Sequence, residues 1–491
     1  MRFIDRLRQP SKGTLALVGF LVALSGCSRM KIELPEPVGP VPSPAQLKWQ
    51  EMETNAFIHF TINTFTDKEW GFGDEKPSLF NPSEPDVDQW ISTLKEAGFK
   101  GVILTTKHHD GFCLWPSQYT QHTIQQSPYK NGEGDLVKEV SEACRKHEMQ
   151  FGIYLSPWDR NRSDYGNSAY IEYYRNQLRE LFTNYGPVFE MWFDGANGGD
   201  GHYGGARETR RIAGATYYEW PVTLDAVKKM QPDVLFFSDA GPHIRWVGNE
   251  KGIAGTTNWN TITPDTLYAG KPGIEELLQT GSEDGTHWIP AEVDVSIRPG
   301  WFYHQKEDSL VKSGERLFDI YLSSVGRGST LLLNVPPDRR GKIHENDLAA
   351  LKEYRRLIDE SFKNNLAKNA TVISSTIRGD DKRYSPMKTI DGEKNTYWAT
   401  DDAVNSGWVE LSLAEESNIS FVMMQEYISL GQRVKEFSIE VFVNGSWQEV
   451  SRGTTIGYKR IVKIDPVRTA KVRINLKDAK ACPVISSISL Y

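Results

Sequence analysis

Short runs of consecutive apolar residues alternate with amphipathic stretches between about residues 55 and 340. The runs have the length of strands buried on both faces, and the stretches between them have the period of helices that are apolar on one side. The expected strands span residues 56–61, 101–106, 150–155, 188–193, 233–238, 292–296 and 330–335, and the expected helices include 87–97, 136–147 and 169–184. About seven or eight such repeats suit an α/β fold of the (β/α)8 TIM-like barrel type better than an open sheet. The pattern is least regular over residues 240–290, which are rich in glycine and threonine.

The pattern changes near residue 365. From residue 371 onward the chain has many short strand-like segments and turn signals such as Asp391-Gly392 and Asn444-Gly445. Such a pattern predicts an antiparallel all-β sandwich or jelly roll. We therefore expect a barrel over residues 49–365 and a β-sandwich over residues 366–491.

Residues 1–26 have the pattern of an export signal. Basic residues precede an apolar stretch over residues 14–23, which is too short to span a bilayer as a helix. Leu24-Ser25-Gly26-Cys27 resembles a bacterial lipobox, which implies that Cys27 is lipidated and begins the mature chain. The alternatives are an ordinary signal peptide and a buried strand that carries a coincidental cysteine. The prolines between residues 28 and 48 predict a stiff extended tether over residues 27–48.

The export signal predicts a bacterial lipoprotein in the periplasm or on the outer membrane or cell surface, with the lipid anchor as its single contact with a membrane. The composition, 39% hydrophobic and 25% charged residues, is typical of a globular protein. The net charge of -7, without long basic runs, argues against a nucleic-acid partner. Four cysteines are too few for a disulfide framework. The 14 tryptophans and 20 tyrosines suit cores, interfaces and sugar-stacking surfaces alike.

Polar residues follow several of the expected strands, and in a barrel the active site lies at the carboxyl ends of the strands. These residues are His59, His108, His109, Tyr154, Asp194 and Asp239. Any one of them could be a helix cap or a hydrogen-bonded core residue. Together they predict one site at the mouth of the barrel.

Two chemistries use histidines and carboxylates in this way. A metal hydrolase would use His108, His109 and Asp194 as ligands, but adjacent residues rarely bind one ion together and no His-x-His spacing is present. A glycoside hydrolase needs two carboxyl groups that flank an oxocarbenium-like transition state. The export signal and the many aromatic residues favour sugars.

Four segments resemble, in order, the signatures of the alpha-L-fucosidases of glycoside hydrolase family 29. They are Phe57-Ile58-His59-Phe60, Asp67-Lys68-Glu69-Trp70, Lys107-His108-His109-Asp110-Gly111-Phe112 and Trp192-Phe193-Asp194-Gly195. The resemblance covers roughly residues 49–340 and implies that Asp194 is the nucleophile of a retaining enzyme. It also implies sugar contacts for His59, Glu69, Trp70, His108, His109 and Tyr154. No metal or organic cofactor is required for this chemistry.

The second carboxyl group has two candidates. Glu250, in Arg245-Trp246-Val247-Gly248-Asn249-Glu250, resembles the acid/base segment of the subgroup selective for alpha-1,3/1,4-linked fucose. Glu292 lies in the expected strand over residues 292–296, so geometry alone permits it. The third option is that neither residue is the acid/base. Residues 296–304 also look like that subgroup, which implies that Arg298 and Trp301 contact the substrate. Phe57 or Trp301 would be a wall for the methyl group of fucose.

Residues 370–491 resemble the discoidin-type (F5/8 type C) sandwich of family 32 carbohydrate-binding modules. The segments that carry the resemblance are Lys388-Thr389-Ile390-Asp391-Gly392, Thr396-Tyr397-Trp398-Ala399-Thr400, Trp408-Val409-Glu410-Leu411 and the strand over residues 485–491. They support the fold and say little about binding, so a sugar-binding module and a stabilising spacer are both open. Such folds can hold a structural calcium ion, although no clear acidic ligand loop is present.

The resemblances imply an exo-alpha-L-fucosidase that removes terminal alpha-1,3/1,4-linked fucose from branched, Lewis-type glycans. Its partners would be fucosylated oligosaccharides or glycoconjugates. The alternatives are an alpha-L-fucosidase of broad specificity and a catalytically inactive sugar-binding lipoprotein.

Overall fold

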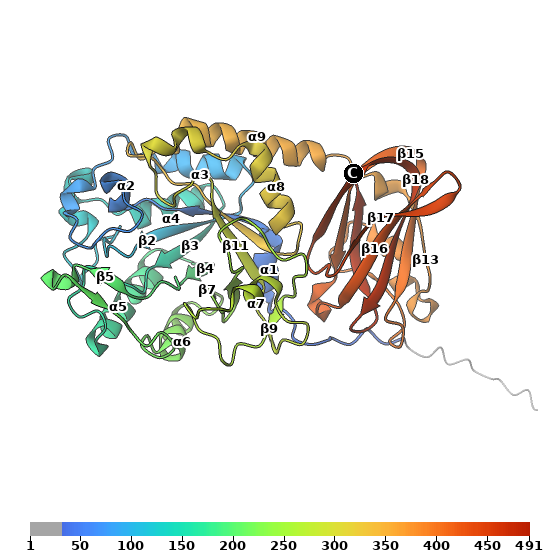
Figure 1. Ribbon diagram of the computed structural model, residues 1–491, viewed down its shortest axis with the longest axis horizontal. Coiled ribbons are helices and arrows are strands. Elements are labelled where there is room, and N and C mark those ends of the chain that lie inside the picture. The colour runs from blue at the N-terminus through green and yellow to red at the C-terminus, as the bar shows by residue number, and fades with distance from the viewer. Residues whose placement is uncertain (1–31) are drawn as a thin grey trace, which may run out of the picture. The chain divides into compact units, whose positions relative to one another are not determined.

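The computed structural model describes residues 32–491 (Figure 1), so the expected signal peptide and Cys27 lie outside the described residues. Eight parallel strands form a closed barrel in the order β1-β12-β11-β8-β7-β4-β3-β2. They are β1 (Thr54–Ile58), β2 (Gly101–Lys107), β3 (Gln150–Leu155), β4 (Glu190–Trp192), β7 (Leu235–Ser238), β8 (Ile244–Trp246), β11 (Ala291–Ser296) and β12 (Thr330–Asn334). The barrel predicted from the alternating pattern is confirmed.

One strand departs from the expected repeat. β8 lies within the irregular segment 240–290 and pairs in parallel with β7, Phe237 opposite Ile244, with no described helix between the two strands. β8 has only three residues and follows β7 after a short loop. The sequence therefore shows no long apolar run at β8 and no helical periodicity before it.

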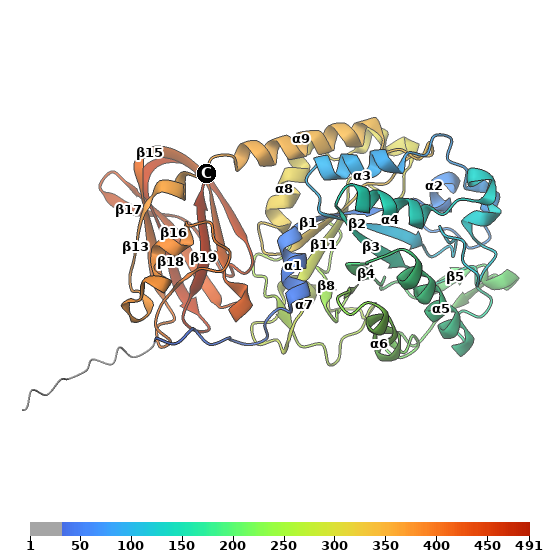
Figure 2. The same cartoon turned by 180° about the vertical axis from the view of Figure 1, so that it is seen from behind.

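Helices surround the strands (Figures 1 and 2). They are α2 (Ile62–Thr66), α3 (Val87–Glu96), α4 (Leu136–Lys146), α5 (Ser168–Asn184), α6 (Trp220–Met230), α7 (Glu275–Thr280), α8 (Gly314–Ser324) and α9 (Glu345–Ser361). Asp86, Asp135 and Ser313 cap α3, α4 and α8 by accepting a hydrogen bond from a backbone N–H in the first turn. Each of these three helices buries an apolar stripe against the strands.

The extended part of the proline-rich segment is shorter than predicted. Helix α1 (Pro44–Met52) begins inside it, because Ser43 and Gln46 form a reciprocal capping box and Pro44 occupies the first turn. Trp49 is buried, and its indole N–H donates to Glu190 Oε2 at the start of β4, 2.8 Å away. The expectation that residues 44–48 are extended is therefore wrong.

The C-terminal domain is an antiparallel seven-stranded sheet with the order β14-β19-β15-β18-β16-β17, and β13 pairs with β15. Its strands are β13 (Thr371–Ser374), β14 (Trp398–Ala399), β15 (Gly407–Glu426), β16 (Val434–Val443), β17 (Ser446–Gly453), β18 (Arg460–Ala479) and β19 (Val484–Leu490). Register shifts interrupt the pairing of β15 with β18, where the long strands bend around an apolar core. The predicted all-β domain is confirmed.

A loop of the barrel is hydrogen-bonded to this domain. The side chain of Gln432 accepts from the Asn260 N–H at 2.8 Å and donates to the Asn258 carbonyl at 2.9 Å. The Asn258 N–H donates to the Thr455 hydroxyl at 2.9 Å. These bonds satisfy buried backbone groups of the loop that follows β8, the strand whose end leads to Glu250.

Candidate active site

A cavity of about 400 Å³ opens at the carboxyl ends of the barrel strands. Eight of the predicted site residues line it: His59, Trp70, His108, His109, Tyr154, Asp194, Glu250 and Trp301. The lining also includes Asp239, which was identified at the end of an expected strand, and residues that were not predicted to be part of the site, Trp192, Trp246 and Asp294 among them. The barrel thus brings together side chains from strands far apart in the sequence.

Asp194 follows β4 and carries a hydrogen bond on each carboxylate oxygen. Its Oδ2 accepts from the Tyr154 hydroxyl at 2.8 Å, and its Oδ1 accepts from the backbone N–H of Ala196 at 2.7 Å. His109 Nε2 lies 3.8 Å from Oδ2. Hydrogen bonds on both oxygens fix the direction in which the carboxylate faces the cavity.

Glu250 lies on the loop after β8, where its side chain remains exposed at the mouth of the cavity. Its Oε2 accepts from the indole N–H of Trp301 at 3.4 Å. Partial burial and the nearby charges of Asp194 and Glu69 raise the pKa of Glu250, against the opposite effect of the Trp301 hydrogen bond. A carboxyl group with a raised pKa and access to solvent suits proton transfer.

The alternative acid/base, Glu292, does not reach the cavity. Its side chain is fully buried, and its Oε2 accepts from the indole N–H of Trp192 at 3.1 Å. Burial and the neighbouring Glu190 raise the pKa of Glu292 well above its ordinary value. Side chains alternate along a strand, so Glu292 and Asp294 both point into the barrel, and Glu292 lies deeper. The proposal of Glu292 as acid/base is therefore wrong.

Two further carboxyl groups line the cavity. Asp294 is buried and accepts from the indole N–H of Trp246 at 2.8 Å; burial and the charge of Glu250 raise its pKa well above its ordinary value. Burial and the charge of Asp194 raise the pKa of Asp239 to about 6. Asp239 directly follows β7, the strand-end position from which it was identified, whereas Asp294 lies within β11, two residues before its end.

The three histidines of the cavity are neutral near pH 7. Burial lowers the pKa of His59 to about 3 and of His109 to about 4, and lowers that of His108 well below its ordinary value. The rings of His108 and His109 lie 4.1 Å apart between their centroids. Neutral imidazoles offer one donor and one acceptor each, which suits sugar hydroxyls.

Glu69 does not line the cavity but holds the loop that carries Trp301. Its carboxylate accepts from the backbone N–H groups of Trp301 and Phe302, at 2.8 and 3.2 Å. His304 Nε2 lies 2.6 Å from the same carboxylate, and its Nδ1 lies 2.7 Å from Asp67 Oδ1. Glu69 therefore fixes the geometry of this loop, and its expected contact with the sugar stays a prediction.

The neighbouring Trp70 does face the cavity. It is 52% exposed and packs the edge of its ring against His109. Arg298, which was expected to contact the substrate, is fully buried behind the loop and donates to Asp347 and Asp308, at 3.0 and 2.9 Å. That expectation is wrong, because the chain turns beyond β11 and directs Arg298 toward α9 rather than into the barrel mouth.

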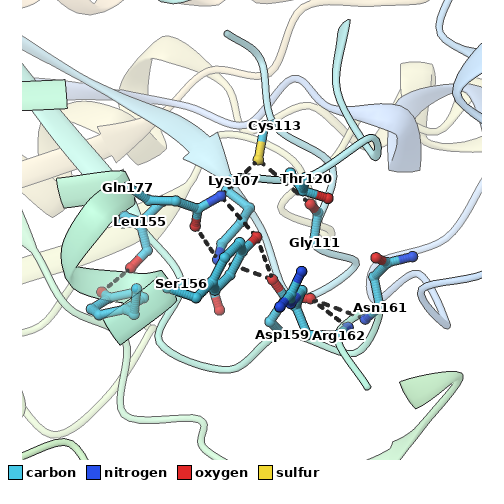
Figure 3. Close-up of polar contacts among 12 residues, drawn as sticks. Lys107, Gly111, Cys113, Thr120, Leu155, Ser156, Asp159, Asn161, Arg162 and Gln177 are labelled. Carbon is cyan, nitrogen blue, oxygen red and sulfur yellow. Dashed lines mark hydrogen bonds and ion pairs between the residues drawn. The ribbon is translucent and has the colours of Figure 1, made fainter. Parts of the chain in front are cut away.

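A buried ion pair supports the loop over residues 108–112 (Figure 3). Lys107 Nζ donates to Asp159 Oδ2 at 3.1 Å and to Gln177 Oε1 at 2.8 Å, and neither charged side chain has exposed surface. Gly111 has a φ of +79°, and a Cβ at this position would lie 2.4 Å from Asp159 Oδ1. The motif therefore needs glycine here to place His108 and His109.

Residues 32–491 contain no group of three or more histidine, cysteine, aspartate or glutamate side chains placed to hold a metal ion. His108, His109 and Asp194 accordingly do not form the metal site that was considered as an alternative. Within the same part of the chain, no helix combines the length and apolar character needed to cross a membrane.

The strand ends of this parallel barrel converge on carboxyl groups, neutral histidines and tryptophans. This combination is typical of the active site of a glycoside hydrolase. The sequence signature of the family named Alpha-L-fucosidase matches residues 41–359, and that of the F5/8 type C domain matches residues 369–488. The chain belongs to the alpha-L-fucosidases of glycoside hydrolase family 29 and carries a C-terminal F5/8 type C domain. The family resemblance drawn from the four motifs is confirmed at this level.

Two plant proteins are similar to nearly the whole chain. Putative alpha-L-fucosidase 1 of Oryza sativa subsp. japonica is 41% identical over 460 residues, 93% of this chain and 86% of the relative. Alpha-L-fucosidase 1 of Arabidopsis thaliana is 39% identical over 476 residues, 96% and 91% of the two chains.

Solved structures of family 29 members are similar to this chain. A glycoside hydrolase 29 family member from an unknown rumen bacterium has a TM-score of 0.83 at 43% identity, covering 93% of this chain and 78% of its own. A Ruminococcus gnavus GH29 fucosidase in complex with fucose has a TM-score of 0.84 at 35% identity, covering 94% and 96%.

Proposed function

We propose that the protein is a retaining exo-alpha-L-fucosidase in which Asp194 is the nucleophile and Glu250 the acid/base. The observation that carries the proposal is the contrast between two carboxyl groups on one cavity. Asp194 accepts a hydrogen bond on each oxygen, which orients its carboxylate group, whereas Glu250 is partly buried, has a raised pKa and remains open to solvent. Pairs of carboxyl groups in such different environments are typical of glycosidases.

The mechanism has two displacements. Asp194 attacks the anomeric carbon while Glu250 gives its proton to the departing glycosidic oxygen, and the C–O bond to the aglycone breaks. Glu250 then takes a proton from water, whose oxygen displaces Asp194 and releases fucose with its original configuration. Asp294 is a poorer acid/base, because it is 3% exposed and its carboxyl group is engaged by Trp246.

The sugar would be bound by neutral polar groups and flat apolar surfaces. His59, His108 and His109 would hold hydroxyl groups, and Tyr154 would orient Asp194. The rings of Phe57 and Trp301 lie 6.3 Å apart between their centroids and border the same cavity, so we assign the methyl group of fucose to this wall. Trp70, exposed at the rim, would contact the aglycone.

We further propose selectivity for alpha-1,3/1,4-linked fucose on branched, Lewis-type glycans. The support is the resemblance of the segment ending in Glu250 and of residues 296–304 to that subgroup. Contact between Glu250 and the Trp301 indole joins these two segments at the cavity mouth, where the aglycone would lie. An alpha-L-fucosidase of broad specificity, or an inactive sugar-binding protein, is the competing assignment.

Fucose release from a Lewis-type trisaccharide and from a simple aryl fucoside tests these assignments. We expect rapid release from the trisaccharide, slower release from the aryl compound, and alpha-fucose as the first product by NMR. Preference for the aryl compound would contradict the linkage selectivity, and beta-fucose as first product would contradict retention. Release from neither substrate would support the sugar-binding alternative.

We propose that the N-terminal segment directs export and that the protein is a bacterial lipoprotein anchored through Cys27. Its location would be the periplasm, the outer membrane or the cell surface. The support is the lipobox-like sequence. Labelled fatty acid should be incorporated during expression of the full chain, and Cys27→Ser should abolish it. Incorporation that survives this substitution would contradict the proposal.

A further inference from the structure

Each of the three buried histidines in the cavity has one ring nitrogen next to a side chain whose own hydrogen-bonding role is fixed. We propose that Asn334, Ser156 and Asn63 are positioning residues that select the tautomers of His59, His109 and His108, so that the sugar meets two acceptors and one donor. This inference rests on the proposed binding of sugar hydroxyls by these histidines. It concerns residues outside the sugar-contacting set.

Asn334 determines the tautomer of His59. The Asn334 amide nitrogen donates to the Trp301 carbonyl at 2.8 Å and to the Ser296 hydroxyl at 2.9 Å. A carbonyl oxygen can only accept, so the orientation of the amide is fixed and its oxygen faces His59. His59 Nδ1 lies 2.8 Å from that oxygen and must carry the hydrogen. In a neutral ring, Nε2 is then a bare acceptor.

Ser156 determines the tautomer of His109 in the same way. Its hydroxyl donates to the Trp158 carbonyl at 2.6 Å, which uses its single hydrogen. His109 Nδ1, 2.7 Å from the same oxygen, must therefore donate to it. His109 Nε2 is then a bare acceptor beside Asp194, and the Tyr154 hydroxyl remains the side-chain donor to that carboxylate.

Asn63 gives His108 the opposite tautomer. The Asn63 amide nitrogen donates to the Glu69 carbonyl at 3.2 Å, which fixes the orientation of this amide as well. The same nitrogen lies 3.5 Å from His108 Nδ1, so this ring nitrogen accepts and Nε2 carries the hydrogen. Asn63 in helix α2 thus makes His108, which directly follows β2, the donor of the set.

The consequence is a fixed polarity for recognition. A hydroxyl group that faces His59 or His109 has to donate, and one that faces His108 has to accept. Because burial keeps all three rings neutral, the pattern persists across the pH range near neutrality. A buried site that reads hydroxyl groups by matched donors and acceptors rejects analogues that lack them.

Nitrogen NMR of the enzyme labelled with ¹⁵N-histidine tests the proposal, because protonated and bare ring nitrogens have well-separated shifts. Each ring is assigned by the signal lost in His59→Gln, His108→Gln or His109→Gln. We expect bare Nε2 atoms in His59 and His109 and a bare Nδ1 in His108. The opposite tautomer in any of the three rings would overturn the proposal.

Two serine variants separate positioning from a merely structural effect. Ser156→Ala should convert the His109 signals to those of mixed tautomers while the His59 signals stay unchanged. Ser92→Ala is the matched control, because this hydroxyl also donates to a backbone carbonyl but contacts no histidine. Unchanged His109 signals in Ser156→Ala would refute the role of Ser156. The measurement uses the free enzyme, so absence of fucose release alone would refute the proposed function and not this inference.

Discussion

Substitution of Glu250 by glutamine tests whether this carboxyl group is the one that transfers the proton. Glutamine keeps the shape of the side chain and an oxygen that can accept from the Trp301 indole, but it has no proton to give. General acid catalysis contributes about 10²–10⁴ in rate, or about 2.7–5.5 kcal/mol of barrier. Since partial burial and the charges of Asp194 and Glu69 raise the pKa of Glu250, we place the loss toward the upper half of that range.

The leaving group decides how much of this loss is visible. For the trisaccharide, whose alcohol needs a proton to depart, we expect kcat/KM to fall by about 10³–10⁴. For a dinitrophenyl fucoside, which departs unaided, kcat/KM should fall less than about tenfold. Azide should restore turnover in the variant and form a fucosyl azide, because it needs no base.

Asp294→Asn is the control, since Asp294 is the other carboxyl group near Glu250 with a strongly raised pKa. It should show the same loss for both substrates and no rescue by azide. Equal losses for both substrates in Glu250→Gln, or leaving-group dependence in Asp294→Asn, would refute the assignment of Glu250.

Three other predictions follow from buried or paired charges. Lys107→Met should lower the free energy of unfolding by about 3–5 kcal/mol in urea titrations, because the charge of Asp159 is left buried and unpaired. The double variant Lys107→Met/Asp159→Leu should regain part of this free energy, and failure to regain any would contradict the prediction. Burial alone would lower the pKa of His304, but its two carboxylate partners raise it, so its stabilisation is full below about pH 6.5 and lost as pH rises through the raised pKa. His304→Gln should therefore cost about 0.5–1 kcal/mol near pH 5.5 and less near pH 9, and equal costs would argue against the ion pairs. Finally, kcat/KM should fall as pH rises through the raised pKa of Glu250, and Glu250→Gln should lack this alkaline limb.

Most of the barrel could be predicted from the sequence, because its strands are buried on both faces and therefore form continuous apolar runs. β2 and β3 begin at the predicted residues, and α3, α4 and α5 begin within one residue of prediction. β8 could not be found in this way, since three residues inside a loop-rich segment carry no periodicity. Helix α1 was missed because it begins at Pro44, after a run of prolines, and a proline starts a helix as readily as it extends a tether.

The site could be predicted in part. Residues at strand ends were identified by position, since every barrel strand directs its carboxyl end to the same face. Arg298 and Glu292 could not be placed, because the sequence does not reveal where a loop turns or how deep an inward-facing side chain lies. The role of Glu69 depends on backbone N–H groups 232 and 233 residues away, and no local pattern encodes such a contact.

The most direct test of the central claim is to trap the covalent intermediate. Incubation with a 2-deoxy-2-fluoro-fucosyl fluoride, followed by peptic digestion and mass spectrometry, locates the labelled residue. We expect one fluorofucosyl group on Asp194, within the peptide that contains Trp192-Phe193-Asp194-Gly195, and no label in Asp194→Asn. A label on Asp239, Asp294 or Glu250, or turnover without any covalent intermediate, would contradict the account.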